Sequence, residues 1–276
     1  MQELYLYNCA LQYLRERINE DTLDHYLNLY RFNSLNSLEE AYERILESAK
    51  ERQHLPNSIG SLDPLKSILF NFQPNVIVTN FENWETVFNT IHQSNYTPPE
   101  RMDFSNNKNA WVLFSKSILT GAKFLSRFQT IEDFKSYCNS FIQGNPDIRI
   151  AFPLLLSEEI KGFGFALACN FLKEWVSPEF VKPDTHTKEI FIGTGFAQQS
   201  DSDFNICRRM INFSAAIKEI PYSVDKVFWL IGSGKLHKTY LRKHDEYFQT
   251  SKQEFIRLYN QSEKPTANKS IATNGA

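Results

Sequence analysis

The stretch EIKGFGFALACNFLKEWVSPEFVKPDTHTKEIFI, residues 159–192, decides the fold prediction. It contains two glycines separated by one residue, Gly162 and Gly164, and then an apolar run, a loop and the pair Pro183–Asp184. Glycine permits positive φ and close backbone approach, so the two glycines indicate a tight turn between helices. A proline disfavours helical geometry at the residue before it. We therefore expect Asp184 at or near the N-terminus of a new helix.

Helical periodicity dominates the rest of the chain. Apolar residues recur at steps of three and four in several segments, which is typical of amphipathic helices. Ser37 with Glu40 and Thr130 with Asp133 are capping patterns that predict helix starts, and Ser223 predicts another. The strongest stripes are Leu4–Ile18, Ala41–Ala49, Trp84–Ile91, Trp111–Leu119, Phe134–Phe141, Ile206–Ile217 and Val224–Ile231.

Strand signals are few. Val76–Ile77–Val78 is the best β-branched run, and it stands alone. Because one isolated run cannot make a sheet, we predict an all-α fold. Residues 261–276 are polar and nearly devoid of large apolar side chains, so we expect a disordered tail there.

Composition sets broad limits. At 276 residues, with 42% hydrophobic content, the chain can form one large domain or two lobes. The net charge of −2 gives no global attraction to nucleic acid, so any such contact needs a local patch. The run Lys235–His244 contains four Lys or Arg residues and no acid. It fits either such a patch or a solvated helix face.

The four cysteines are scattered and form no CxxC pair. This pattern argues against a zinc knuckle or an iron–sulfur loop and favours buried thiols in a reducing compartment, and we expect no metal and no cofactor. No N-terminal signal pattern is present, and no apolar run reaches the ~18 residues of a membrane span. We expect a soluble, intracellular, cytoplasmic protein without a membrane partner.

The glycine turn has the features of an anion site. Phe163 would plug the turn against the core, while the N–H groups of Gly162, Gly164 and Phe165 would point outward at a helix start. Free N–H groups and the positive end of the helix dipole suit a phosphate, and Lys161 would add a charge. By itself a GxG pair is more often a plain helix-to-helix turn.

Asp184 has two interpretations. As a helix cap it would contribute about 1 kcal/mol. As a functional group, an ionised carboxylate near a phosphate site is costly because like charges repel, and it can stabilise positive charge that develops on a sugar. His186, two residues further on, would point away from Asp184, and we expect it to be a hydrogen-bonding residue at the helix start.

The stretch resembles the helix-hairpin-helix (HhH-GPD) DNA glycosylases, whose signature is an (L/I)xGxG hairpin, a helix and a (V/P)D-x-H element that holds the catalytic aspartate. The match extends over about 35 residues. The matching residues are Ile160, Gly162, Gly164, Ala168, Pro183, Asp184 and His186.

This resemblance implies two helical lobes with a cleft between them. Residues 81–178 would form the central lobe that ends in the hairpin, and residues 1–80 with 179–260 would form the second lobe. The hairpin residues Lys161, Gly162, Phe163, Gly164 and Phe165 would bind the DNA backbone. We expect a monomer whose partner is double-stranded DNA.

Two departures from the family pattern narrow the type. Bifunctional members carry a lysine two residues after the second hairpin glycine, where this chain has Ala166, which cannot form a Schiff base. The resemblance therefore implies a monofunctional enzyme, unless Lys161 or Lys188 supplies the amine. Members with an iron–sulfur cluster have four closely spaced cysteines after the aspartate, where this chain has only Cys207, so that branch is excluded.

The implied reaction flips a damaged or modified base out of the duplex and hydrolyses its N-glycosidic bond, with Asp184 stabilising the sugar cation. Trp111, Trp84 or Phe124 would stack on the flipped base, or would simply be core residues. The wedge residue is not identified by the sequence. The sequence does not identify the base, and the candidates include alkylated purines, oxidised purines and modified pyrimidines of the kind found in viral genomes. The first two imply DNA repair, and the last would make the protein an antiviral defence factor.

Two other functions compete with base excision. A non-catalytic helix-hairpin-helix protein would bind DNA without releasing a base, and a helical scaffold with a coincidental motif would show no salt-dependent DNA binding. Asp184 discriminates between the glycosylase and the non-catalytic binding protein, because only the enzyme needs the charge of this residue.

Overall fold

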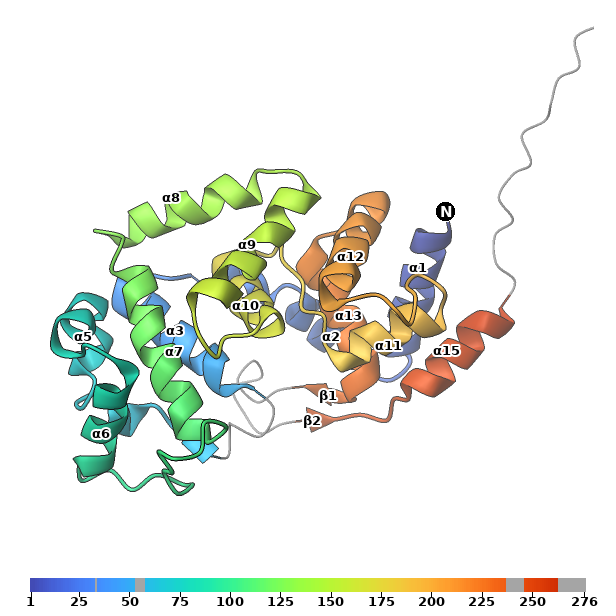
Figure 1. The fold of residues 1–276 in the computed structure, drawn as a ribbon. Coiled ribbons are helices and arrows are strands. Elements are labelled where there is room, and N and C mark those ends of the chain that lie inside the picture. Colours follow the sequence, from blue (N-terminus) through green and yellow to red (C-terminus); the bar gives the residue numbers. More distant parts are fainter. Residues whose placement is uncertain (33, 53–57, 237–245, 263–276) are drawn as a thin grey trace, which may run out of the picture. The chain divides into compact units, whose positions relative to one another are not determined.

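The structure is a computed structural model that describes residues 1–32, 34–52, 58–236 and 246–262 (Figure 1). Within these ranges the regular secondary structure is helical apart from one two-residue antiparallel pairing. In it β1 (Lys235–Leu236) pairs with β2 (Glu246–Tyr247), with Lys235 opposite Tyr247. The predicted all-α class is confirmed. No helix in the described part of the chain has both the length and the apolarity needed to cross a membrane.

The chain divides into two compact units, each with its own helices. Unit 2 consists of Tyr30–Pro183 and Ser202–Ile211, and unit 1 of Met1–Leu29, Asp184–Asp201 and the described residues from Asn212 onward. The helices of unit 2 are α3 (Leu38–Lys50), α5 (Pro74–Asn80), α6 (Trp84–Gln93), α7 (Ala110–Leu125), α8 (Ile131–Ile142), α9 (Pro146–Glu159) and α10 (Phe165–Phe171), which continues into the π-helical turn η4 (Leu172–Val176). Unit 2 also has the 3-10 turns η2 (Asp63–Leu65) and η3 (Phe70–Phe72), and the turn η1 (Leu29–Phe32) stands at its start.

Unit 1 contains α1 (Gln2–Arg15), α2 (Glu20–Leu27), α11 (Thr185–Gly193), α13 (Pro221–Ser233), the β pairing and α15 (Lys252–Gln261). Helix α12 (Asp203–Ile217) has residues in both units.

The bounds of the units differ from those of the predicted lobes. The predicted central lobe is residues 81–178, but apolar residues from the described part of 30–80 pack into the same core as that segment. The physical reason is visible in α3, where the buried hydroxyl of Tyr42 donates a hydrogen bond of 2.7 Å to the carbonyl of Ile118 in α7. At the other end, α15 extends to Gln261, and residues 263–276 of the predicted tail lie outside the described residues.

Helix α7 is the centre of unit 2 and packs against α3, α5 and α6 (Figure 1). Its sequence AWVLFSKSILTGAKFL is apolar on nearly all sides, and such a helix is expected to be buried. Four of its side chains reach solvent, and their spacing of three, four and three places them on one stripe. They are Leu113, Lys116, Thr120 and Lys123.

The predicted helix caps at Ser37 and Thr130 are confirmed. Ser37 Oγ accepts the amide of Glu40 at 3.1 Å. Thr130 and Asp133 form a full capping box in which both hydrogen bonds measure 3.1 Å.

The predicted cap at Ser223 is wrong. Helix α13 begins at Pro221, whose fixed φ suits the first helical position, so Ser223 already lies inside the helix. Its hydroxyl instead donates a hydrogen bond to the carbonyl of Leu27 at 3.2 Å. The β-branched run 76–78 is likewise helical, because Pro74 starts α5 and Ile77 is fully buried.

In unit 1, α13 packs against α1, α2 and α11. The contact with α11 is sealed by the rings of Phe191, Phe213 and Phe228, whose centroids lie 5.1–5.8 Å apart. Near the other end of the same contact, a Cβ placed on Gly232 would lie 2.3 Å from Cβ of His186. The two helices therefore run antiparallel in close contact, and this contact fixes the first turn of α11, which Asp184 precedes.

Candidate functional site

The turn between α9 and α10 requires a glycine at position 162. Gly162 has φ +82°, a conformation that L side chains rarely adopt. A Cβ at this position would lie 2.8 Å from Ser117 Oγ and 3.1 Å from the carbonyl oxygen of Leu113. Both the positive φ at this position and the closeness of α7 therefore exclude a side chain larger than that of glycine.

Gly164 differs from Gly162 in both respects. Its φ of −69° is accessible to any residue, and a Cβ there would meet nothing within 4 Å. It is the N-terminal cap residue of α10 and is exposed. The fold itself thus gives no reason for glycine at this position, whereas a ligand that approaches the backbone closely would give one.

Phe163 points into the core, as predicted, and is 1% exposed. Its ring lies edge-on to Phe171 with the centroids 6.4 Å apart. Its amide, however, donates to the carbonyl of Ile160 at 3.0 Å. Phe163 therefore anchors the turn, and its N–H group is already used by the Ile160 carbonyl.

Four other amides in this segment remain available. Those of Gly162, Gly164, Phe165 and Ala166 donate no hydrogen bond within the described part of the chain. The helix that follows begins with these groups, and unsatisfied amides at a helix start attract anions. The ring of Phe165 is half-buried, 6.1 Å from that of Phe204.

Two hydroxyls of α7 hold the turn at a single peptide position, Lys161. The amide of Lys161 donates to Thr120 Oγ1 at 2.9 Å, and its carbonyl accepts from Ser117 Oγ at 2.8 Å. Thr120 Oγ1 also donates to the carbonyl of Lys116 at 2.6 Å. We call Ser117 and Thr120 the hydroxyl clamp. Sequence reasoning missed it, although two hydroxyls three residues apart on an apolar helix are a detectable signal.

Charges of both signs surround the turn, where Glu158 and Lys161 are exposed. Glu159, at the end of α9, is bound by both guanidinium nitrogens of Arg127, one contact measuring 3.1 Å. This hydrogen bonding to Arg127 lowers the pKa of the Glu159 carboxyl, so the pair stays ionised and mutually neutralised. Lys161 is exposed and forms no salt bridge within the described residues.

Asp184 is the N-terminal cap of α11. Its Oδ1 accepts the amide of Thr187 at 2.9 Å, and its backbone carbonyl accepts that of Lys188 at 3.0 Å. Its second carboxylate oxygen accepts no hydrogen bond from any described residue, and the side chain is partly exposed. One oxygen thus orients the carboxylate and the other remains for a ligand.

His186 has a packing role in the described residues. Its side chain fills the space that the absent Cβ of Gly232 leaves, and no hydrogen bond joins it to Asp184 within the described part of the chain. Its Nδ1 is buried without a hydrogen bond.

The three aromatic residues predicted to stack on a base have different positions. Trp111 is fully buried and Phe124 is 1% exposed, so both are core residues, which is the second of the two interpretations that the sequence allowed. Each lies at an inward position of α7. Trp84 is partly buried, with its ring stacked on Phe104 at 5.5 Å.

Other predicted groups lie as follows. Ala166 is half-buried in the first turn of α10. Cys207 is buried with its Sγ 3.9 Å from that of Cys169. No group of three or more potential metal ligands occurs among the described residues. Of the basic run, Lys235 and Leu236 form β1, and residues 237–244 lie outside the described ranges.

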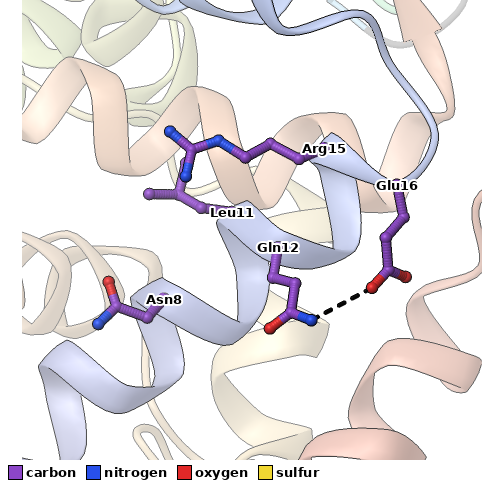
Figure 2. Close-up of a pocket in the computed structure, with 5 residues that line it drawn as sticks. All are labelled: Asn8, Leu11, Gln12, Arg15 and Glu16. Atoms are coloured by element: carbon purple, nitrogen blue, oxygen red, sulfur yellow. Dashed lines mark hydrogen bonds between the residues drawn. The ribbon is translucent and has the colours of Figure 1, made fainter.

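Neither of two surface hollows is lined by the hairpin or by Asp184. Figure 2 shows one that is lined by four residues of α1 and by Glu16, the C-cap residue of that helix, and there Gln12 donates to Glu16 at 3.3 Å. The other, of about 220 Å³, is lined in part by Phe134, Cys138 and Trp175. Burial raises the pKa of the Cys138 thiol to about 12, so it is not a nucleophile near neutral pH.

No family model and no curated protein matches the chain. A solved structure that is similar to it is that of the 8-oxoguanine DNA glycosylase of Thermotoga maritima, at 15% sequence identity and a TM-score of 0.44. The similarity covers 78% of this chain and 89% of that chain. At this identity and TM-score it assigns neither a fold nor an activity to the chain.

Proposed function

We propose that the chain is a monofunctional DNA glycosylase of the helix-hairpin-helix type, which flips a damaged or modified base out of duplex DNA and hydrolyses its N-glycosidic bond. The observation that carries this proposal is the carboxylate of Asp184, with one oxygen fixed by the Thr187 amide and the other uncommitted. The resemblance of residues 160–186 to the glycosylase signature supports the same role.

In this function the hairpin holds the DNA backbone. A phosphate oxygen would accept hydrogen bonds from the amides of Gly162, Gly164 and Phe165, and Lys161 would add a charge. Hydrogen bonds to a charged acceptor contribute about 1.5–3 kcal/mol each, so a few amides suffice to fix one phosphate. The open space at Gly164, where a Cβ would meet nothing, is the space that this phosphate needs.

The chemical step breaks the bond between C1′ of the deoxyribose and the base nitrogen. The base leaves with the bonding electrons, and positive charge develops on C1′ and the ring oxygen. The free carboxylate oxygen of Asp184 stabilises this charge and orients the water that adds to C1′. The proton that this water loses and the proton that the departing base gains balance, so the products are a free base and an abasic site.

The strand should remain uncut. Strand cleavage by such enzymes requires an amine that attacks C1′ and forms a Schiff base, and the position that would supply it is Ala166. We therefore expect borohydride, which traps Schiff bases covalently, to trap no protein–DNA adduct during turnover. A trapped adduct would show that a lysine elsewhere in the chain supplies the amine. Lys161 and Lys188 would then be the first residues to replace by glutamine.

The test of the function is mass spectrometry of bases released from a panel of duplexes that carry alkylated purines, oxidised purines or modified pyrimidines. Release of one class with an intact strand is the expected result, and the class that reacts separates a repair from a defence role. DNA binding without release of any base would contradict the proposal and favour a non-catalytic binding protein. Absence of salt-dependent DNA binding would contradict both.

The hydroxyl clamp provides a test of the hairpin. Thr120→Val keeps the side-chain shape but removes the acceptor of the Lys161 amide, which should cost about 1–3 kcal/mol in the free energy of unfolding and weaken DNA binding. Thr120→Ser retains the acceptor and should restore both quantities, measured by urea unfolding and fluorescence anisotropy. Equal behaviour of the two variants would show that the clamp does not hold the turn.

A further inference from the structure

The solvent-facing stripe of α7 borders the hairpin on one side. Successive helical residues are about 100° apart, so Ser117, Leu113, Thr120, Lys116 and Lys123 follow one another in that order around the helix. The hairpin contacts the first three of these residues. The two residues on the far side are lysines, and α7 carries no acidic residue.

An aromatic stack lies along the far side of this stripe. Lys116 Nζ is 4.8 Å from the ring centroid of Trp84. Trp84 stacks on Phe104 with an interplanar angle of 23°, and Phe104 meets the edge of Phe88 at 5.5 Å. Phe104 is nevertheless 49% exposed. A large ring that is held by two others and still half in water offers a fixed apolar surface to a ligand.

Charges of both signs lie near the stack. Lys108 and Lys116 form no salt bridge within the described part of the chain. The carboxylate of Asp103 is engaged by the amide and the hydroxyl of Ser105, at 3.0 and 2.7 Å. Asp103 directly precedes Phe104 and Glu85 directly follows Trp84, so two acidic residues flank the stack in the sequence.

We propose that the DNA interface extends from the hairpin across Lys116 and Lys123 to Phe104, where an unpaired base of the bound strand stacks on the exposed ring. The lysines neutralise phosphates along this path, and the ring binds a base face, a combination that single-stranded nucleic acid requires. Paired bases have both faces covered by their neighbours, so Phe104 selects DNA that is locally unpaired. This extension depends on the proposed function.

The experiment measures affinity by fluorescence anisotropy for two duplexes of one sequence, one fully paired and one with a single-nucleotide bulge. Phe104→Leu keeps an apolar side chain but loses the ring, and we expect about tenfold weaker binding of the bulged duplex and little change for the paired one. Phe104→Trp should restore it. Lys116→Gln should reduce the slope of log affinity against log salt by about one, for both duplexes.

Two control variants lie in the same unit away from this stripe. Ile148→Ala removes another exposed apolar side chain, and Lys135→Gln another exposed lysine, and both should bind like the wild type. An equal affinity change of Phe104→Leu for both duplexes, or no change, would overturn the extension.

The hairpin variant Gly164→Ala, measured in the same assay, separates the two levels of the proposal. If Gly164→Ala weakens binding of both duplexes and Phe104→Leu weakens neither, the extension fails while the proposed function stands. If the wild type binds neither duplex, the proposed function fails and the extension with it. If Gly164→Ala binds both duplexes as the wild type does, no phosphate is bound at the hairpin and the extension loses its starting point.

Discussion

Asp184→Asn is expected to reduce base release at least about 100- to 1,000-fold, because it removes the negative charge that would stabilise the sugar cation. Binding of the same DNA should remain, since the hairpin is unchanged. Asparagine caps helices as well as aspartate does and can still accept the Thr187 amide, so the free energy of unfolding should change by less than about 0.5 kcal/mol. Single-turnover base release, DNA affinity and urea unfolding measure the three quantities.

Asp133→Asn is the matched control. Asp133 is also a carboxylate in the first turn of a helix, where it accepts the amide of Thr130 at 3.1 Å, but it lies in α8. Its variant should release the base at the wild-type rate. An Asp184→Asn protein that is fully active, or one that unfolds, would show that Asp184 is a structural cap and not a catalytic group.

The two hairpin glycines should respond in opposite ways to the same substitution. Gly162→Ala forces an alanine to φ +82° and places its Cβ 3.1 Å from the Leu113 carbonyl, which should cost about 2–4 kcal/mol in the free energy of unfolding. Gly164→Ala meets no protein atom, so its cost should be below about 1 kcal/mol. Its Cβ would instead hold a phosphate away from the amides, and DNA affinity should fall at least about tenfold.

Urea unfolding and fluorescence anisotropy on both variants test this pair. Comparison at a temperature where Gly162→Ala remains folded separates lost stability from lost binding. If the Gly164→Ala protein binds DNA as tightly as the wild type, the hairpin does not bind a phosphate in the proposed way. A Gly162→Ala protein of unchanged stability would show that the turn relaxes away from α7.

Local signals in the sequence predicted the local parts of the site well. The glycine pair predicted a tight turn with Phe163 buried, and Pro183 with Asp184 predicted a helix start capped by the carboxylate. These predictions hold because turn dihedrals and caps depend on residues within a few positions of one another. The prediction at Ser223 failed because Pro221, two residues earlier, already starts the helix.

Features that depend on packing could not be predicted from local sequence signals. Trp111 and Phe124 carry the same apolar signal as any ring in a binding pocket, and only their burial shows that they are core residues. Trp84 is distinguished from them by Phe104, which lies in a loop twenty residues away and stacks on it.

The sequence by itself determined the helical class, the hairpin and the cap at Asp184, because periodicity, glycine and proline act over short distances along the chain. Only the tertiary structure decided which hairpin amides are free, that Gly164 faces open space and that hydroxyls of α7 hold the turn. These properties come from contacts between residues some forty positions apart, such as Thr120 and Lys161. Side-chain packing sets such contacts, and no local pattern encodes them.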